Sequence, residues 1–139
     1  PKQLHCYQSV YCPYVNVDKL YGKMPTSRND AIAWFKNGGK IKGTDIKKTF
    51  VTDIIKGEVG DIVFMGESGD MQGHAVLLES INIISDTKIE INTYGVYSPN
   101  GLIGSEKMIF EKNSNNEWIN TSHGGNYVFR GYGQFSKNN

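Results

Sequence analysis

A chain of 139 residues, of which 38% are hydrophobic, is long enough for one compact domain with a single core. Fifteen basic and fourteen acidic side chains give a net charge of +1, which favours neither a nucleic-acid-binding nor a strongly acidic protein. No stretch approaches the roughly 18 consecutive apolar residues that span a membrane, and no signal-peptide pattern opens the chain. We therefore expect one domain, residues 1–139, that has neither nucleic acid nor a membrane as a partner.

The amino-terminal part of the chain is predicted to contain two helices. Residues 1–11 are polar and aromatic without a clear period, and they predict an extended arm. Pro13 suits the first turn of a helix, and Gly22 stands where that helix is expected to end. Ser27 is a good N-cap for a second helix, which Asn37-Gly38-Gly39 would stop. The apolar side of this second helix is predicted to consist of Ala31, Ile32, Trp34 and Phe35.

Beyond residue 40 the pattern changes to short strands. Apolar and β-branched residues alternate with polar ones, and clusters rich in Gly, Asn and Ser separate the runs. Two helices followed by about six strands predict an α+β domain, with helices against one face of an antiparallel sheet. The expected strands are residues 49–52, 62–65, 75–81, 88–93, 107–110 and 126–129, with an irregular close at 131–135.

The most informative stretch is a pair of apolar strands, at 60–65 and 73–79, in which His74 opens the second strand. A histidine at a strand end can direct its imidazole at a nucleophile elsewhere in the fold. Glu90 and Asn92 follow on alternate positions of one strand, and such a pair could accept the second ring N–H of a histidine. Each of these residues also has a plainer interpretation, as a strand-end histidine or as solvent-facing polar side chains.

Two cysteines precede this block, and Cys12 is the better candidate nucleophile. Considered alone, Cys6 and Cys12 could be free thiols, a small disulfide or a catalytic residue, whereas their spacing does not predict a zinc site. Cys12 directly precedes Pro13, where the positive end of a helix dipole would lower the pKa of the thiol. Pro13 would interrupt any helix that continued from Cys6. The order cysteine, histidine, then carboxylate or amide is that of papain-like thiol hydrolases.

Together these motifs resemble a CHAP domain, the cysteine, histidine-dependent amidohydrolase/peptidase family. The resemblance covers residues 12–133 and rests mainly on the blocks at 60–64, 73–76 and 90–92. It implies a papain-like fold, with two or three amino-terminal helices packed on an antiparallel sheet of about six strands. It also implies cleavage of a peptide or N-acetylmuramoyl–L-alanine amide bond in peptidoglycan. In the pattern of that family Cys12 is the nucleophile, His74 the base, Glu90 the orienting carboxylate and Asn92 a supporting group.

The chain departs from the family pattern immediately before the candidate nucleophile. Tyr11 stands where family members usually carry a glutamine, so the side-chain donor of the oxyanion hole is missing there. Residues 1–11 contain no Asp or Glu, which argues against the calcium site of some CHAP lysins. We expect neither a metal nor a cofactor. His5 and His123 are the rivals of His74 for the role of base.

A polymeric wall substrate requires an open groove, and aromatic side chains give such a groove a large contact area. The domain is expected to act outside the cell, either secreted or carried by a phage particle, as one part of a larger lysin or virion protein. The alternatives are a non-catalytic wall-binding or virion-structural module with the same fold, and a thiol hydrolase of another amide. The candidate groove residues are Tyr94, Tyr97, Trp118 and Tyr132 beside the loop at 67–72, whereas Trp34 is assigned to the core.

Overall fold

The computed structural model describes residues 28–41, 43, 45–67, 73–97, 102–123 and 127–137. In this part of the chain one α-helix, α3 (Arg28–Asn37), precedes a series of strands and two short 3-10 helices. The strands are β1 (Ile46–Val51), β2 (Ile62–Glu67), β3 (Gly73–Ser85), β4 (Lys88–Tyr97), β5 (Leu102–Lys112), β6 (Trp118–Asn120) and β7 (Tyr127–Lys137), and the 3-10 helices are η1 (Ile54–Lys56) and η2 (Thr121–His123).

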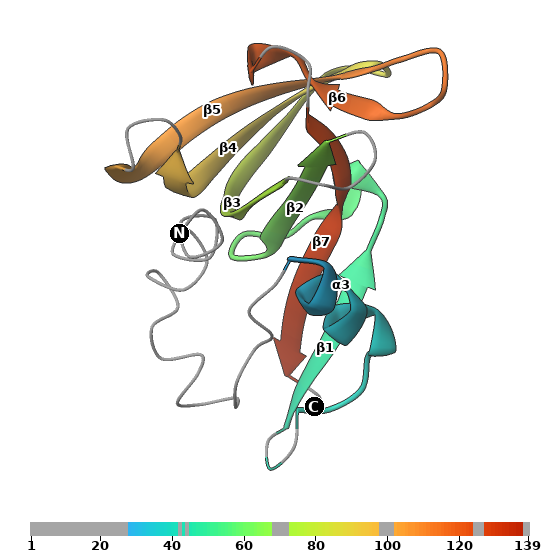
Figure 1. Cartoon of the computed structure of the whole chain (residues 1–139), viewed down its shortest axis with the longest axis vertical. Coiled ribbons are helices and arrows are strands. Elements are labelled where there is room, and N and C mark those ends of the chain that lie inside the picture. Colours follow the sequence, from blue (N-terminus) through green and yellow to red (C-terminus); the bar gives the residue numbers. More distant parts are fainter. Residues whose placement is uncertain are drawn as a thin grey trace.

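Six of the strands form a closed antiparallel barrel. Their order is β7-β2-β3-β4-β5-β6, and the pairing of Ile119 with Val128 joins β6 back to β7. β1 lies outside the closed barrel, and β7 is its one partner among the described strands (Figure 1). Bulges in the β2–β7 and β3–β4 pairs bend these long strands, which helps the sheet to curve and close.

The predicted α+β, papain-like fold, with two or three helices on an antiparallel sheet, is therefore wrong. The described residues are mostly strand with a single α-helix, and the sheet closes on itself instead of presenting one face to a layer of helices. The closing strand β6 has only three residues and was not expected from the sequence. The first predicted helix and the arm at 1–11 lie outside the described residues.

The second predicted helix is confirmed, because α3 ends at Asn37 and is followed by Gly38 and Gly39. Both glycines have positive φ angles, of 65° and 82°, as is usual directly after a helix. The predicted apolar side of α3 contacts the sheet through Ala31 and Phe35, which are both buried. α3 lies beside β1 and β7 (Figure 1).

Alternation along the strands separates two apolar clusters, one inside the barrel and one beneath α3. β2 shows this most clearly, because Val63 and Met65 belong to the interior cluster while Ile62 and Phe64 pack toward α3. The interior cluster is completed by Ile54, Val76, Leu78, Ile89, Ile91, Met108, Phe110, Phe129 and Tyr132. The outer cluster consists of Ala31, Phe35, Ile62, Phe64 and Ala75, with Ile32, Trp34, Phe50, Leu77 and Phe135 against it.

Candidate functional site

The β2–β3 hairpin carries the histidine of the candidate site. The two strands are antiparallel, with Met65 opposite His74 and Gly66 opposite Gly73. The expectation that these residues form a strand pair with His74 near the start of the second strand is confirmed for the backbone. Cys12 lies outside the described residues, as do its rival Cys6 and His5, a rival of His74 for the role of base. The predicted contact between Cys12 and His74 therefore stays a prediction.

Asp61 anchors the start of β2, and the sequence motifs gave it no role of its own. Its carboxylate oxygen Oδ2 accepts hydrogen bonds from the backbone N–H of Glu58 and from Nε2 of Gln134, each at 2.8 Å. Its backbone carbonyl accepts the N–H of Leu78, and the Gly60 N–H donates to the carbonyl of Leu78, both at 2.8 Å. These contacts tie the Gly60-Asp61 segment to β3 and β7. The Gly-Asp pair thus fixes the hairpin that bears His74.

Burial is the largest influence on Asp61, and it raises the pKa of this carboxyl above its ordinary value. The hydrogen bonds from Glu58 and Gln134 oppose that shift, while the negative charge of Glu58 adds to it. When the pKa of a carboxyl is higher in the folded than in the unfolded protein, its full contribution to stability is present only at pH values below its pKa in the unfolded protein. That contribution is lost as the pH rises through the folded pKa.

We therefore expect the unfolding free energy to contain a component that falls with rising pH above about 3.9, the ordinary pKa of aspartate. Asp61→Asn should remove this component, because the amide oxygen can still accept both hydrogen bonds but carries no charge. Urea unfolding at a series of pH values measures it. Asp86→Asn, which changes an exposed aspartate in the β3–β4 turn, is the control. Identical pH slopes for wild type and Asp61→Asn would contradict the assignment.

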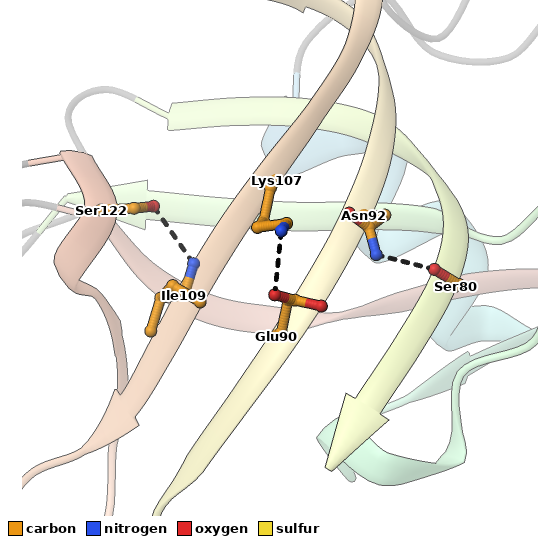
Figure 2. Close-up of polar contacts among 6 residues, drawn as sticks. All are labelled: Ser80, Glu90, Asn92, Lys107, Ile109 and Ser122. Atoms are coloured by element: carbon orange, nitrogen blue, oxygen red, sulfur yellow. Dashed lines mark hydrogen bonds and ion pairs between the residues drawn. The ribbon is translucent and has the colours of Figure 1, made fainter. Parts of the chain in front are cut away.

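Glu90 and Asn92 lie on one face of β4, as the alternation predicted. Each already has a partner from a neighbouring strand (Figure 2). The Glu90 carboxylate lies 3.4 Å from the Nζ of Lys107 on β5, and Asn92 donates from Nδ2 to the Ser80 hydroxyl on β3 at 2.9 Å. Figure 2 shows these contacts beside a third, in which the Ile109 N–H donates to the hydroxyl of Ser122 at 3.1 Å. Both candidate residues thus take part in cross-strand contacts on the sheet surface.

The register of β3 and β4 does not bring these two residues to His74. Glu90 pairs with Asn82 and Asn92 with Ser80, which are eight and six positions along β3 from His74. At about 3.3 Å per residue these separations are about 26 and 20 Å, far beyond the reach of two side chains. Antiparallel strands joined by a short turn pair at nearly equal distances from it, so the turn at residues 86–87 determines this outcome to within the one-residue bulge beside it. Continuing the register beyond the Leu77–Tyr94 pair places Tyr97, not Glu90, across from His74.

The four aromatic residues predicted to line a groove have different environments. Tyr132 is fully buried, donates from its hydroxyl to the Ile54 carbonyl at 2.6 Å, and offers no surface to a substrate. Burial, followed by the charges of Asp61 and Asp53, raises the pKa of Tyr132. Trp118 is half-buried against the barrel core. Tyr94 is exposed on β4, and the backbone of Tyr97 ends that strand.

Comparisons with protein-family models, curated proteins and solved structures found no match to this chain. The described helices include none with the length and apolar character needed to cross a membrane. Within the described ranges no group of three or more His, Cys, Asp or Glu side chains is arranged to hold a metal ion.

Proposed function

We propose that the chain is a thiol-dependent hydrolase that cleaves an amide bond of bacterial peptidoglycan, with Cys12 as nucleophile and His74 as general base. The observation that supports it most is the folding of the Gly60–Phe64 and Gly73–Val76 blocks as adjacent strands, with His74 as the second residue of β3. These two blocks carry the resemblance to CHAP domains, and Asp61 ties the first of them to Leu78 of β3 and to Gln134 of β7.

The chemistry needs two groups from this chain. His74 takes the thiol proton, and the Cys12 thiolate attacks the amide carbonyl carbon. As the C–N bond breaks, the imidazolium returns the proton to the leaving amine, and a thioester remains on Cys12. Water, deprotonated by His74, then attacks the thioester, releasing a carboxylic acid and restoring the thiol. Pro13 directly after Cys12 favours a helix start there, whose dipole would stabilise the thiolate.

Glu90 and Asn92 are left out of this proposal, because the register holds them far from His74 and both have cross-strand partners. Peptidoglycan is the proposed substrate because the CHAP-like motifs are those of wall hydrolases. The corresponding place of action is outside the cell, by secretion or by delivery with a phage particle. Mass spectrometry of the released fragments distinguishes cleavage in the stem peptide, in the cross-bridge and next to the muramoyl group.

Loss of turbidity of purified Gram-positive cell walls, followed with matched cysteine variants, tests the proposal. Cys12→Ser should abolish lysis, because a serine hydroxyl beside His74 is a far weaker nucleophile than a thiolate. Cys6→Ser should retain most of the activity. Wall binding without lysis by the wild type would support the alternative of a non-catalytic wall-binding module. Lysis that survives Cys12→Ser but is lost in Cys6→Ser would refute the assignment of the nucleophile.

A further inference from the structure

Positive charge is concentrated in one short segment of a nearly neutral chain. Residues 36–48 contain five lysines and one acidic residue, Asp45, a net charge of +4. The whole chain has a net charge of +1, so the remainder has a net charge of −3. In the structure this segment includes the end of α3, the loop after it and the start of β1.

The fold places two of these lysines directly opposite each other. Lys40 and Lys47 form an isolated antiparallel bridge, flanked by hydrogen bonds from the Ile41 N–H to the Ile46 carbonyl at 2.8 Å and from the Lys48 N–H to the Gly39 carbonyl at 3.0 Å. Both lysines are exposed, and in the described part of the chain neither belongs to an ion pair, not even with the exposed Asp45. Like charges in directly opposed positions are destabilising, so an anion between them would relieve a repulsion built into the fold.

A hydroxyl group extends this pair into a row of three hydrogen-bond donors. Ser136 of β7 lies directly opposite Lys47 of β1, and it is exposed. Directly opposed residues share one face of the sheet and have Cβ atoms about 4.5–5.5 Å apart. The row therefore presents two ammonium groups and a hydroxyl from three adjacent backbone segments. Such a set of donors suits a phosphate group, which has several acceptor oxygens and a negative charge, and lysine is a common phosphate ligand.

The aromatic side chains of this region lie on the other face. Phe135, which pairs with Lys48, and Phe50 both pack against the cluster beneath α3. The donor row thus has no described aromatic neighbour on its own face on which a base could stack, and stacking is the usual basis of single-stranded nucleic-acid binding. These observations favour a polymer of phosphate groups without bases.

We propose that Lys40, Lys47 and Ser136 form a binding site for the phosphate groups of a linear phosphate-bearing polymer. This site is separate from the His74 hairpin, and it stands whether or not the chain hydrolyses a wall amide. The competing explanation is that Lys47 on the edge strand β1, with Lys40 opposite it, only prevents this edge from pairing with another chain. That explanation requires no ligand, so a binding measurement separates the two.

Titration calorimetry of the full chain with short-chain inorganic polyphosphate tests the site. Lys40→Gln/Lys47→Gln should lower the affinity about tenfold or more at low salt and flatten its salt dependence. Ser136→Ala should have a smaller effect in the same direction. The control, Lys56→Gln/Lys88→Gln, removes the same charge at two exposed lysines elsewhere and should change the affinity at most about twofold.

Four outcomes would overturn the proposal. The first is a wild-type protein that does not bind polyphosphate, and the second is an equal loss in both double variants, which would indicate a response to net charge alone. The third is tighter binding of a single-stranded oligonucleotide than of polyphosphate. The fourth is self-association of Lys40→Gln/Lys47→Gln together with an unchanged polyphosphate affinity, which would leave edge protection as the role of the pair. Inorganic phosphate, tested separately, shows whether one phosphate group suffices.

Discussion

Gly131→Ala is expected to destabilise the protein by about 3 kcal/mol or more, because two penalties of about 1–3 kcal/mol each coincide at this position. Gly131 has a φ of 150°, which side-chain-bearing residues rarely adopt. A Cβ atom there would also lie 2.3 and 2.5 Å from the ring carbons of Phe50 and 3.0 Å from the Val51 carbonyl oxygen. The backbone of β7 cannot retreat easily, because it pairs with β1 on one side and β2 on the other.

Thermal unfolding followed by circular dichroism measures the effect, with an expected fall in Tm of roughly 10 °C. Gly39→Ala is the matched control. Gly39 also has a positive φ, of 82°, but a Cβ atom there would meet nothing within 4 Å. Only the conformational penalty, about 1 kcal/mol, should remain in that variant. A similar fall in Tm in both variants would show that the Phe50 ring leaves room for a Cβ atom at residue 131.

Lys48→Met should cost about 2–4 kcal/mol, because it removes the charged donor at the carboxyl end of α3. The Lys48 ammonium donates to the carbonyls of Trp34 and Gly38, each at 2.8 Å, and it lies 4.9 Å from the centre of the Trp34 ring. The side chain is only 7% exposed, so water cannot easily replace these contacts. A positive charge here also complements the helix dipole. Methionine would retain the apolar contacts and leave both carbonyls without their donor.

Urea unfolding at neutral pH measures this loss, and the neighbouring residue offers the control. Lys47→Met changes an exposed lysine of the same strand that makes no described side-chain contact, so its effect should stay within about 0.5 kcal/mol. If both substitutions cost the same, the stability would reflect net charge, and the assigned helix cap would be contradicted. A loss confined to Lys48→Met identifies the cap as the cause.

Local signals in the sequence were good predictors of local structure. The glycines after Asn37 end α3 as expected, and the apolar pattern at 62–65 is a strand that is buried on both faces. Closure of the barrel was not predictable in this way, since it depends on one pairing through the three-residue strand β6. Hydrophobic alternation shows which face of a strand is buried, but it does not distinguish an open sheet from a closed one.

In the candidate site, too, the sequence predicted which face of a strand a residue occupies but not which residues lie opposite each other on neighbouring strands. Alternation placed Glu90 and Asn92 correctly on one face of β4, but the prediction compared distances along the sequence instead of distances from the turn. Counting outward from the turn at residues 86–87 places Glu90 opposite Ile83, and the bulge between Ile83 and Ser85 shifts it by one residue to Asn82, far from His74 in either case. Tyr132 was predicted to line a groove, but it is buried and its hydroxyl donates a hydrogen bond to the Ile54 carbonyl. The sequence alone does not show which tyrosine hydroxyls have such a partner inside the protein.

The central claim, amide hydrolysis by Cys12, is tested most directly by mass spectrometry of purified peptidoglycan after digestion. The wild-type protein should release fragments in which one amide bond has gained the elements of water, each with a new amine and a new carboxylic acid. The Cys12→Ser variant, shown to be folded by its unchanged circular dichroism spectrum, should release none. Intact amide bonds after digestion with the wild type, or the same fragments from Cys12→Ser, would contradict the account.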